Sequence, residues 1–257
     1  MQGTDDAKGW RPAKDLRFAR NLEAIALAVE EIPRVAQSNP VAFVSGAKGW
    51  RAMAIFGPGD GINRFVVEPS WAWRGHYIPA LMRAYPFMLE PKDEGSIRLW
   101  PGVAPEPLEE GVLPFFENGE ASERVRQIFG FLRQVHAGMA NVQPALALLD
   151  EHKLLVPWSR FEGQEMVLGD QKLYILDAEA FGDLAADVFL QLRDLQALPW
   201  LYAHLHSLLH SRFFDSPDYA PADMVDVGSV DATNQINENA DLEILTALSE
   251  DLGDFEL

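Results

Sequence analysis

Between positions 71 and 87 the chain reads WAWRGHYIPALMRAYPF, a dense run of aromatic and cationic residues. Indole and phenol rings offer contact area to a ligand or partner, and arginines offer paired donors to an anion or carboxylate. The same residues also fit the edge of a core with arginine stacked on tryptophan, and this structural interpretation is favoured. The candidate binding residues are Trp71, Trp73, Arg74, His76, Tyr77, Arg83, Tyr85 and the more distant His204.

Three histidines lie in the stretch LYAHLHSLLH, residues 201–210. On an α-helix His206 and His210 share a face, an arrangement that suits two metal ligands. Neither an HExxH nor an HxD pattern supplies further ligands, so no metal is expected and the pair is predicted to be solvated. His204 borders the apolar stripe of the helix and is predicted to be half-buried and hydrogen-bonded.

Other patterns for catalysis or cofactor binding are missing from the sequence. It contains no Cys and no GxSxG nucleophile elbow, and the glycine-rich GPGDGIN (57–63) lacks phosphate-loop spacing and is expected to be a turn. Asp177 is predicted to be a helix N-cap. The sequence therefore favours a non-enzymatic protein without a cofactor. A small-molecule enzyme with a pocket near Arg83, Tyr85 and His204 stays open as the alternative.

The charge balance excludes several classes of partner. The 257 residues carry 21 basic and 39 acidic side chains, and residues 216–257 hold eleven acids and no base. So acidic a chain repels phosphate, which disfavours nucleic acid and anionic membranes and leaves a protein or a small molecule as partner. No apolar run is long enough to span a membrane and no signal peptide is evident, so the cytoplasm is expected, with leaderless export to the cell surface as the alternative.

Apolar periodicity predicts the strands that position these residues. Residues 41–44, 51–56 and 64–68 are predicted to form an antiparallel meander, with glycine-rich turns between them. Residues 22–29 fit either a strand or a helix. A short helix is expected over 78–84, followed by a strand that pairs with residues 96–100.

Later segments predict helices around a further set of short strands over 156–177. Val125, Ile128, Phe129 and Leu132 begin a helical stripe, which Gly138 and Pro144 are expected to kink or split. Two more helices are predicted over 184–195 and 200–212. The fold class is therefore α+β, with a small antiparallel sheet and hairpins packed against several helices. It forms one domain over residues 1–215, with residues 1–20 as an arm held by Trp10, while 216–257 is expected to be a largely disordered acidic tail with a short helix at 242–252.

Three segments of the chain resemble the bacterial SapC family. They are FARNLEAIALAVEEIPRVAQSNPVAFV (18–44), GHYIPALMRAYPF (75–87) and LYAHLHSLL (201–209), and the resemblance spans roughly residues 10–214. The middle block is the most distinctive, because Ile-Pro-Ala leads to Arg-x-Tyr-Pro-Phe. In the last block His204, Leu205, Ser207 and Leu208 fall on matching positions. The acidic tail, His206 and His210 depart from the family pattern.

The resemblance implies an accessory or binding role rather than a defined reaction. The family name comes from association with a paracrystalline surface layer in some bacteria, and no catalytic residue or cofactor is established for the family. Its genes often lie near genes for outer-membrane receptors and flavin-halogenase-like proteins, which implies a surface or metabolite context. A second alternative rests on the acidic tail: the chain is a leaderless export substrate or a docking partner that uses this tail.

Overall fold

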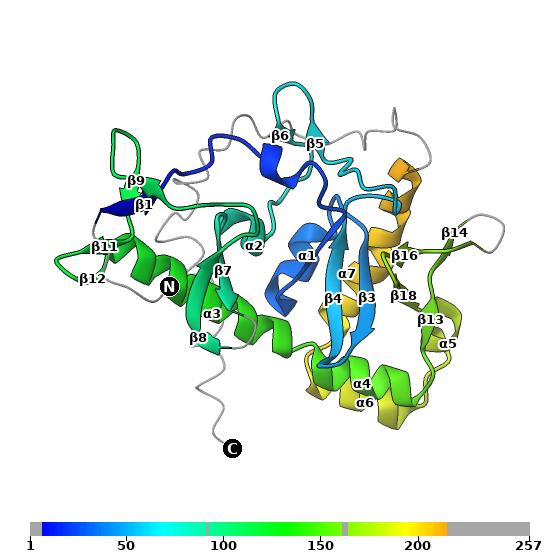
Figure 1. Ribbon diagram of the computed structural model, residues 1–257. Helices are drawn as coiled ribbons and strands as arrows, with labels where there is room; N and C mark the ends of the chain where they lie inside the picture. The colour runs from blue at the N-terminus through cyan, green and yellow to red at the C-terminus, as the bar shows by residue number, and fades with distance from the viewer. Residues whose placement is uncertain (1–6, 91–92, 161–163, 215–257) are drawn as a thin grey trace, which may run out of the picture.

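A long hairpin lies at the centre of the molecule (Figure 1). The structure, a computed structural model, describes residues 7–90, 93–160 and 164–214. Strand β3 (Val41–Gly46) pairs antiparallel with β4 (Gly49–Ile55) over the full length of β3, as predicted for residues 41–44 and 51–56. The turn between the strands ends at Gly49, whose φ of 97° lies in the left-handed region that favours glycine.

This hairpin is the middle of a five-stranded antiparallel sheet with the order β13-β18-β3-β4-β2. The other three strands of the sheet are three residues long. With the helices and ribbons around the sheet, they confirm the predicted α+β class. They are β2 (Ala24–Ala26) and β13 (Leu155–Pro157) at the two edges and β18 (Tyr174–Leu176) between β13 and β3.

The prediction that residues 64–68 form the third strand of the meander, next to β4, was wrong. Strand β2 pairs with β4, while the segment 64–68 contributes only β5 (Val66–Val67), which pairs with β6 (Ala72–Trp73). The reason lies in Asn63, whose backbone N–H donates to the Arg20 carbonyl and whose amide donates to the Ala19 carbonyl. These bonds hold the chain after the glycine-rich turn against the N-terminal segment, and the Arg64 backbone N–H donates to the Phe56 carbonyl, just beyond the end of β4.

A second apolar cluster forms beside the sheet. Strands β7 (Phe87–Glu90) and β8 (Asp93–Leu99) make the predicted hairpin, which packs on helix α3 (Glu123–Ala140). Trp10 is buried there and stacks on Phe115 at 5.3 Å between ring centroids, so it does hold the N-terminal segment. The remaining strands form small ribbons: β1 (Lys8–Trp10), β9 (Glu106–Pro107), β10 (Leu113–Pro114), β11 (Phe116–Glu117), β12 (Glu120–Ala121), β14 (Ser159–Arg160), β15 (Gln164–Glu165), β16 (Val167–Leu168) and β17 (Gln171–Lys172).

The helices begin and end where the sequence places caps and prolines. Ser122 accepts a hydrogen bond from the Val125 N–H at the start of α3, and Asp177 caps α5 by accepting from the N–H groups of Glu179 and Ala180. The predicted split of the long helical stripe is confirmed, because a second helix begins at Gln143. The other helices are α1 (Ile32–Val35), α2 (Ala80–Arg83), α4 (Gln143–Glu151), α5 (Ala178–Gly182), α6 (Ala186–Asp194) and α7 (Leu198–Ser207), with 3₁₀ helices η1 (Arg17–Ala19), η2 (Val29–Glu31) and η4 (Leu208–Phe214).

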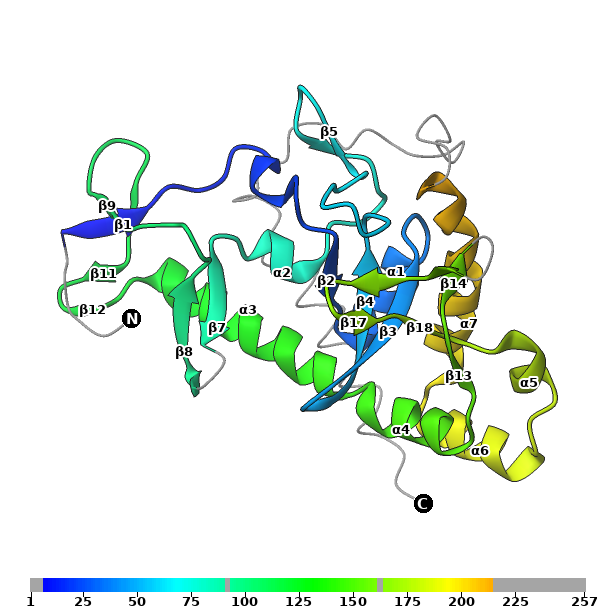
Figure 2. The ribbon, with the colours of Figure 1, turned by 45° about the vertical axis from the view of Figure 1, so that its right-hand side comes forward.

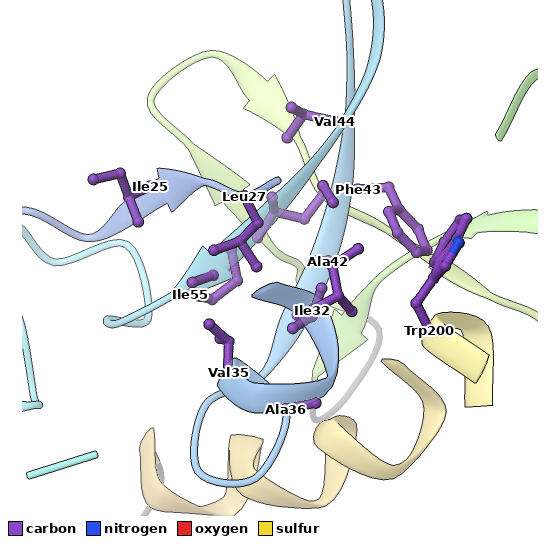
Figure 3. Close-up of a cluster of buried hydrophobic side chains, with 14 of the residues drawn as sticks. Ile25, Leu27, Ile32, Val35, Ala36, Ala42, Phe43, Val44, Ile55 and Trp200 are labelled. Atoms are coloured by element: carbon purple, nitrogen blue, oxygen red, sulfur yellow. The ribbon is translucent and has the colours of Figure 1, made fainter. Parts of the chain in front are cut away.

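The main core fills the space between the central hairpin and helices α1 and α7. Figure 3 shows Leu27 and Ile32 gathered beside Ile55, with Phe43 of β3 turned toward Trp200 of α7. Burying an aliphatic or aromatic side chain of this size contributes roughly 1.5–3 kcal/mol, so this cluster fixes how α7 lies on the sheet. The predicted tail, with its helix at 242–252, lies outside the described residues.

Candidate functional site

The two tryptophans of the 71–87 segment lie in different surroundings. Trp73 is fully buried against Phe56 and Phe65, and its indole N–H donates to the Tyr77 carbonyl at 3.0 Å. Trp71 lies in the tight turn between β5 and β6 with a φ of 59°. This positive φ takes Trp71 out of the strand, so the two indole rings do not share a strand face.

Two arginines, Arg17 and Arg74, each rest on an aromatic ring. The Arg17 guanidinium lies 5.0 Å from the centroid of the half-buried Trp71 ring, and that of Arg74 lies 5.5 Å from the ring of Phe213. Arrangements of this kind stabilise by about 0.5–1 kcal/mol at exposed positions. Arg74 is therefore part of the packing of η4, whereas Trp71 lies beside the N-terminal segment.

Tyr77 and Arg83 belong to a buried network around Glu31, a residue that the sequence analysis missed. The Glu31 carboxylate accepts hydrogen bonds from the Ala80 and Ala28 backbone N–H groups at 2.6 and 3.1 Å and from the Tyr77 hydroxyl at 3.1 Å. Arg83 donates to the Tyr77 hydroxyl at 2.8 Å. Burial raises the pKa of Glu31, and these hydrogen bonds and the Arg83 charge oppose the rise. The network joins η2 to α2.

His204 is completely buried rather than half-buried as predicted. Its Nε2 accepts from the Leu176 N–H at 3.1 Å, so the ring proton is on Nδ1, which donates to the Val41 carbonyl at 2.9 Å. Burial lowers the pKa of His204 to about 4. The neutral ring therefore connects α7 to both β18 and β3.

The other histidines lie nearer the surface. His76 is exposed, and its backbone N–H donates to Ser38. The helical face expected for His206 and His210 is not formed, because α7 ends at Ser207 and His210 lies in a 3₁₀ helix. Burial lowers the pKa of His210. Across residues 7–90, 93–160 and 164–214 no three metal-ligating side chains gather into one group.

Tyr85 differs from the other candidates because it lines an open pocket of about 630 Å³. Its ring stacks on Phe18 at 3.7 Å between centroids, and the Trp100 ring meets it edge-on at 5.4 Å. Burial raises the pKa of Tyr85. The rest of the lining comes from the segment 11–21, so the pocket, called the basic pocket below, lies between the N-terminal segment and the joint after α2.

Cations line the basic pocket at regular intervals along the chain. Basic residues occur at every third position from 8 to 20, and four of them, Arg11, Lys14, Arg17 and Arg20, are pocket residues. Successive residues three apart lie on one side of a 3₁₀ turn or of an extended chain with threefold twist. This spacing, with Phe18 between the cations, is the signal that sequence analysis could have used to find the pocket.

Two of the four cations have no carboxylate partner in the described part of the chain. Lys14 is exposed and makes no ion pair there, and Arg20 donates only to the side-chain oxygen of its neighbour Asn21. Arg17 lies 3.7 Å from Asp15, whereas Arg11 pairs with Glu106 and Glu109. The outer part of the pocket therefore has cationic groups available to a further anion.

Comparison with known proteins gives one match. A family model described as SapC matches residues 6–212. This span includes the whole basic pocket, the Glu31 network and His204. No curated protein and no solved structure matches the chain.

Proposed function

The chain belongs to the SapC family, and we propose that it is a non-enzymatic binding protein whose basic pocket receives an acidic segment of a partner protein. The observation that carries this proposal is the row of four cations beside the stacked rings of Phe18 and Tyr85. Carboxylates of the segment would pair with the cations, and its apolar side chains would cover the rings.

The shape of the pocket favours an extended peptide over a small enclosed substrate. The pocket is open, and Lys14, Arg17 and Arg20 are exposed side chains that follow one another along the chain. An isolated ion pair at such a surface contributes little, about 0–1 kcal/mol, so affinity needs several pairs formed together. A chain with repeated carboxylates supplies them, and guanidinium groups can hold carboxylates with two parallel hydrogen bonds.

The proposed alternative, an enzyme pocket near Arg83, Tyr85 and His204, has less support from the geometry. Of these three residues only Tyr85 lines the basic pocket. Arg83 faces Tyr77 in the Glu31 network, and both ring nitrogens of His204 are engaged by backbone groups of the sheet. A general base held in this way has no free nitrogen to offer a substrate.

The cellular setting of the binding is also a proposal. The surface-layer association implied by the family name supports an accessory role in a cell-surface system, carried out from the cytoplasm or after leaderless export. The domain that binds would comprise residues 1–215. None of the helices in the described ranges is long and apolar enough to cross a membrane.

Binding of a fluorescent oligoglutamate peptide to the full-length protein tests the proposal. The wild-type chain should raise the anisotropy of the probe at low salt and release it as salt is added, because exposed charges are screened within about 10 Å at 0.1 M salt. Exchange of the two available cations, Lys14→Glu with Arg20→Glu, should weaken binding at least tenfold, or about 1.4 kcal/mol.

A matched control separates the pocket from net charge. Arg133 on α3 and Arg193 on α6 are exposed arginines outside the pocket, and their exchange for Glu changes the net charge by the same amount. This control should bind the probe within about twofold of wild type. Equal loss in both double variants, or no binding by the wild-type chain, would refute the proposed function.

A further inference from the structure

We infer that the last residues of this chain, 241–257, occupy the basic pocket and compete there with the acidic segment of the partner. The inference rests on the proposed function, since it names a second, intramolecular ligand for the same site. Four observations support it: the charge distribution, the composition of the segment, the place where the described chain ends and the length of the connection.

The negative charge of the protein is concentrated at its C-terminal end. Residues 7–214 carry 21 basic and 25 acidic side chains, so the described body is close to neutral. Residues 215–257 carry twelve acidic side chains and no basic one. Five of the 21 cations lie within residues 8–20, against a single acid, Asp15. The most basic and the most acidic parts of the chain are thus both near its ends, and they attract each other.

The final segment matches both chemical features of the basic pocket. It reads DLEILTALSEDLGDFEL and contains six carboxylate side chains among leucine, isoleucine and phenylalanine residues. The carboxylates suit Lys14, Arg17 and Arg20, and the apolar side chains suit the stacked rings of Phe18 and Tyr85. Residues 215–240 carry the other six acids with a lower density of apolar side chains, so they fit a connection better than a ligand.

The described chain ends next to the segment that supports the pocket. Phe213 in η4 packs on Phe65 at 5.2 Å between ring centroids. Two residues before Phe65, the Asn63 N–H donates to the carbonyl of the pocket residue Arg20 at 2.9 Å. In Figure 1 β5 and β6 lie directly above the dark-blue turn of η1 and to the left of the orange helical end of the described chain, and in Figure 2 β5 again lies to the left of that end. The described chain therefore ends near the segment that supports the pocket.

The connection is long enough to reach the pocket. Residues 215–240 provide 26 residues, and a flexible chain of that length has a root-mean-square span of about 30 Å. A ligand tethered by such a linker acts at an effective concentration in the millimolar range. Even a weak contact of residues 241–257 would then keep the pocket largely occupied, and a partner would have to displace it.

Zero-length crosslinking tests the contact directly. A carbodiimide couples an amine to a carboxylate only when the two are in contact, and Lys14 is the one lysine that lines the basic pocket. We expect mass spectrometry of the monomeric full-length protein to find Lys14 joined to Asp or Glu side chains in 241–257, with the product lost at high salt. Crosslinks from that segment only to lysines away from the pocket, or none at all, would overturn the inference.

Competition with the oligoglutamate probe gives the second test. Replacement of three tail carboxylates by amides, Glu250→Gln, Asp251→Asn and Asp254→Asn, should tighten probe binding about fivefold. The matched control removes three exposed carboxylates of α4–α6 instead, Glu151→Gln, Asp183→Asn and Asp187→Asn, and should change binding less than twofold. In the Lys14→Glu, Arg20→Glu background the tail substitutions should have no effect.

The outcomes separate the two proposals. Probe binding that depends on Lys14 and Arg20 but is unchanged by the tail substitutions would overturn the intramolecular contact and leave the proposed function standing. Absence of probe binding by every variant, together with a Lys14 crosslink to 241–257, would refute the partner-binding function and support the intramolecular contact.

Discussion

At the scale of single residues, the buried polar side chains hold together parts of the chain that are far apart in sequence. His204 bonds to backbone groups of Val41 and Leu176, and Glu31 bonds to those of Ala28 and Ala80. Each such group is stable in the interior because its polar atoms have partners there. Sequence patterns placed His204 beside an apolar stripe but gave no sign of Glu31, because a buried carboxylate is recognisable only once its donors are in place.

The buried His204 makes the stability of the fold sensitive to acid. Its pKa is lowered from about 6.5 to about 4 in the folded protein by burial. Its contribution is therefore complete above pH 6.5 and is lost as the pH falls toward 4, because the unfolded chain takes up the proton first. The loss amounts to about 3 kcal/mol. Denaturant unfolding at pH 7.5 and 4.5 measures it.

A His204→Gln variant serves as the control for this prediction. The amide keeps one donor and one acceptor but does not titrate. The free energy of unfolding of the variant should therefore fall less steeply than that of the wild type between pH 6.5 and 4, by the equivalent of about one proton. Parallel pH profiles for the two proteins would contradict the role assigned to His204.

At the scale of elements, local patterns predicted most pieces and missed those that depend on distant contacts. The α3 helix was foreseeable because its apolar stripe and its Ser122 cap are encoded side by side, and the β3–β4 hairpin because two apolar runs flank a glycine turn. The pairing of β2 with β4 was not foreseeable from local patterns. It depends on Asn63, which bonds to the carbonyls of Ala19 and Arg20 and so leaves the edge of β4 to β2. The basic pocket was not predicted, because residues 1–20 were expected to form an arm held by Trp10 and the spacing of their cations was not used.

We predict that the segment from Trp71 to Phe87 is a structural joint first and a binding surface second, and two substitutions test this order. Trp73→Ala removes a fully buried ring and should lower the free energy of unfolding by roughly 3–5 kcal/mol. Tyr85→Ala removes a half-buried ring that stacks on Phe18, so it should cost about 2 kcal/mol and also weaken binding of the oligoglutamate probe. Thermal unfolding beside probe anisotropy measures both effects. An unchanged melting temperature in both variants would rule out the structural role.

At the scale of the whole molecule, the strong net charge of −18 conceals a nearly neutral body. Composition alone predicts that the protein avoids polyanions such as phosphate polymers. It does not describe the surface around residues 11–21, where four cations surround two stacked rings. Local potential rather than net charge decides what a pocket attracts, because surface charges are screened over distances much shorter than the molecule.

Mapping of the probe contact on the full-length protein tests the binding role of the basic pocket most directly. Isotope-labelled protein titrated with the oligoglutamate peptide at low salt should show its largest amide shifts within residues 11–21 and around Tyr85. Shifts concentrated instead on the other exposed arginines, such as those of α3 near Arg126 and Arg133, or spread evenly over all cations, would contradict the role assigned to the pocket.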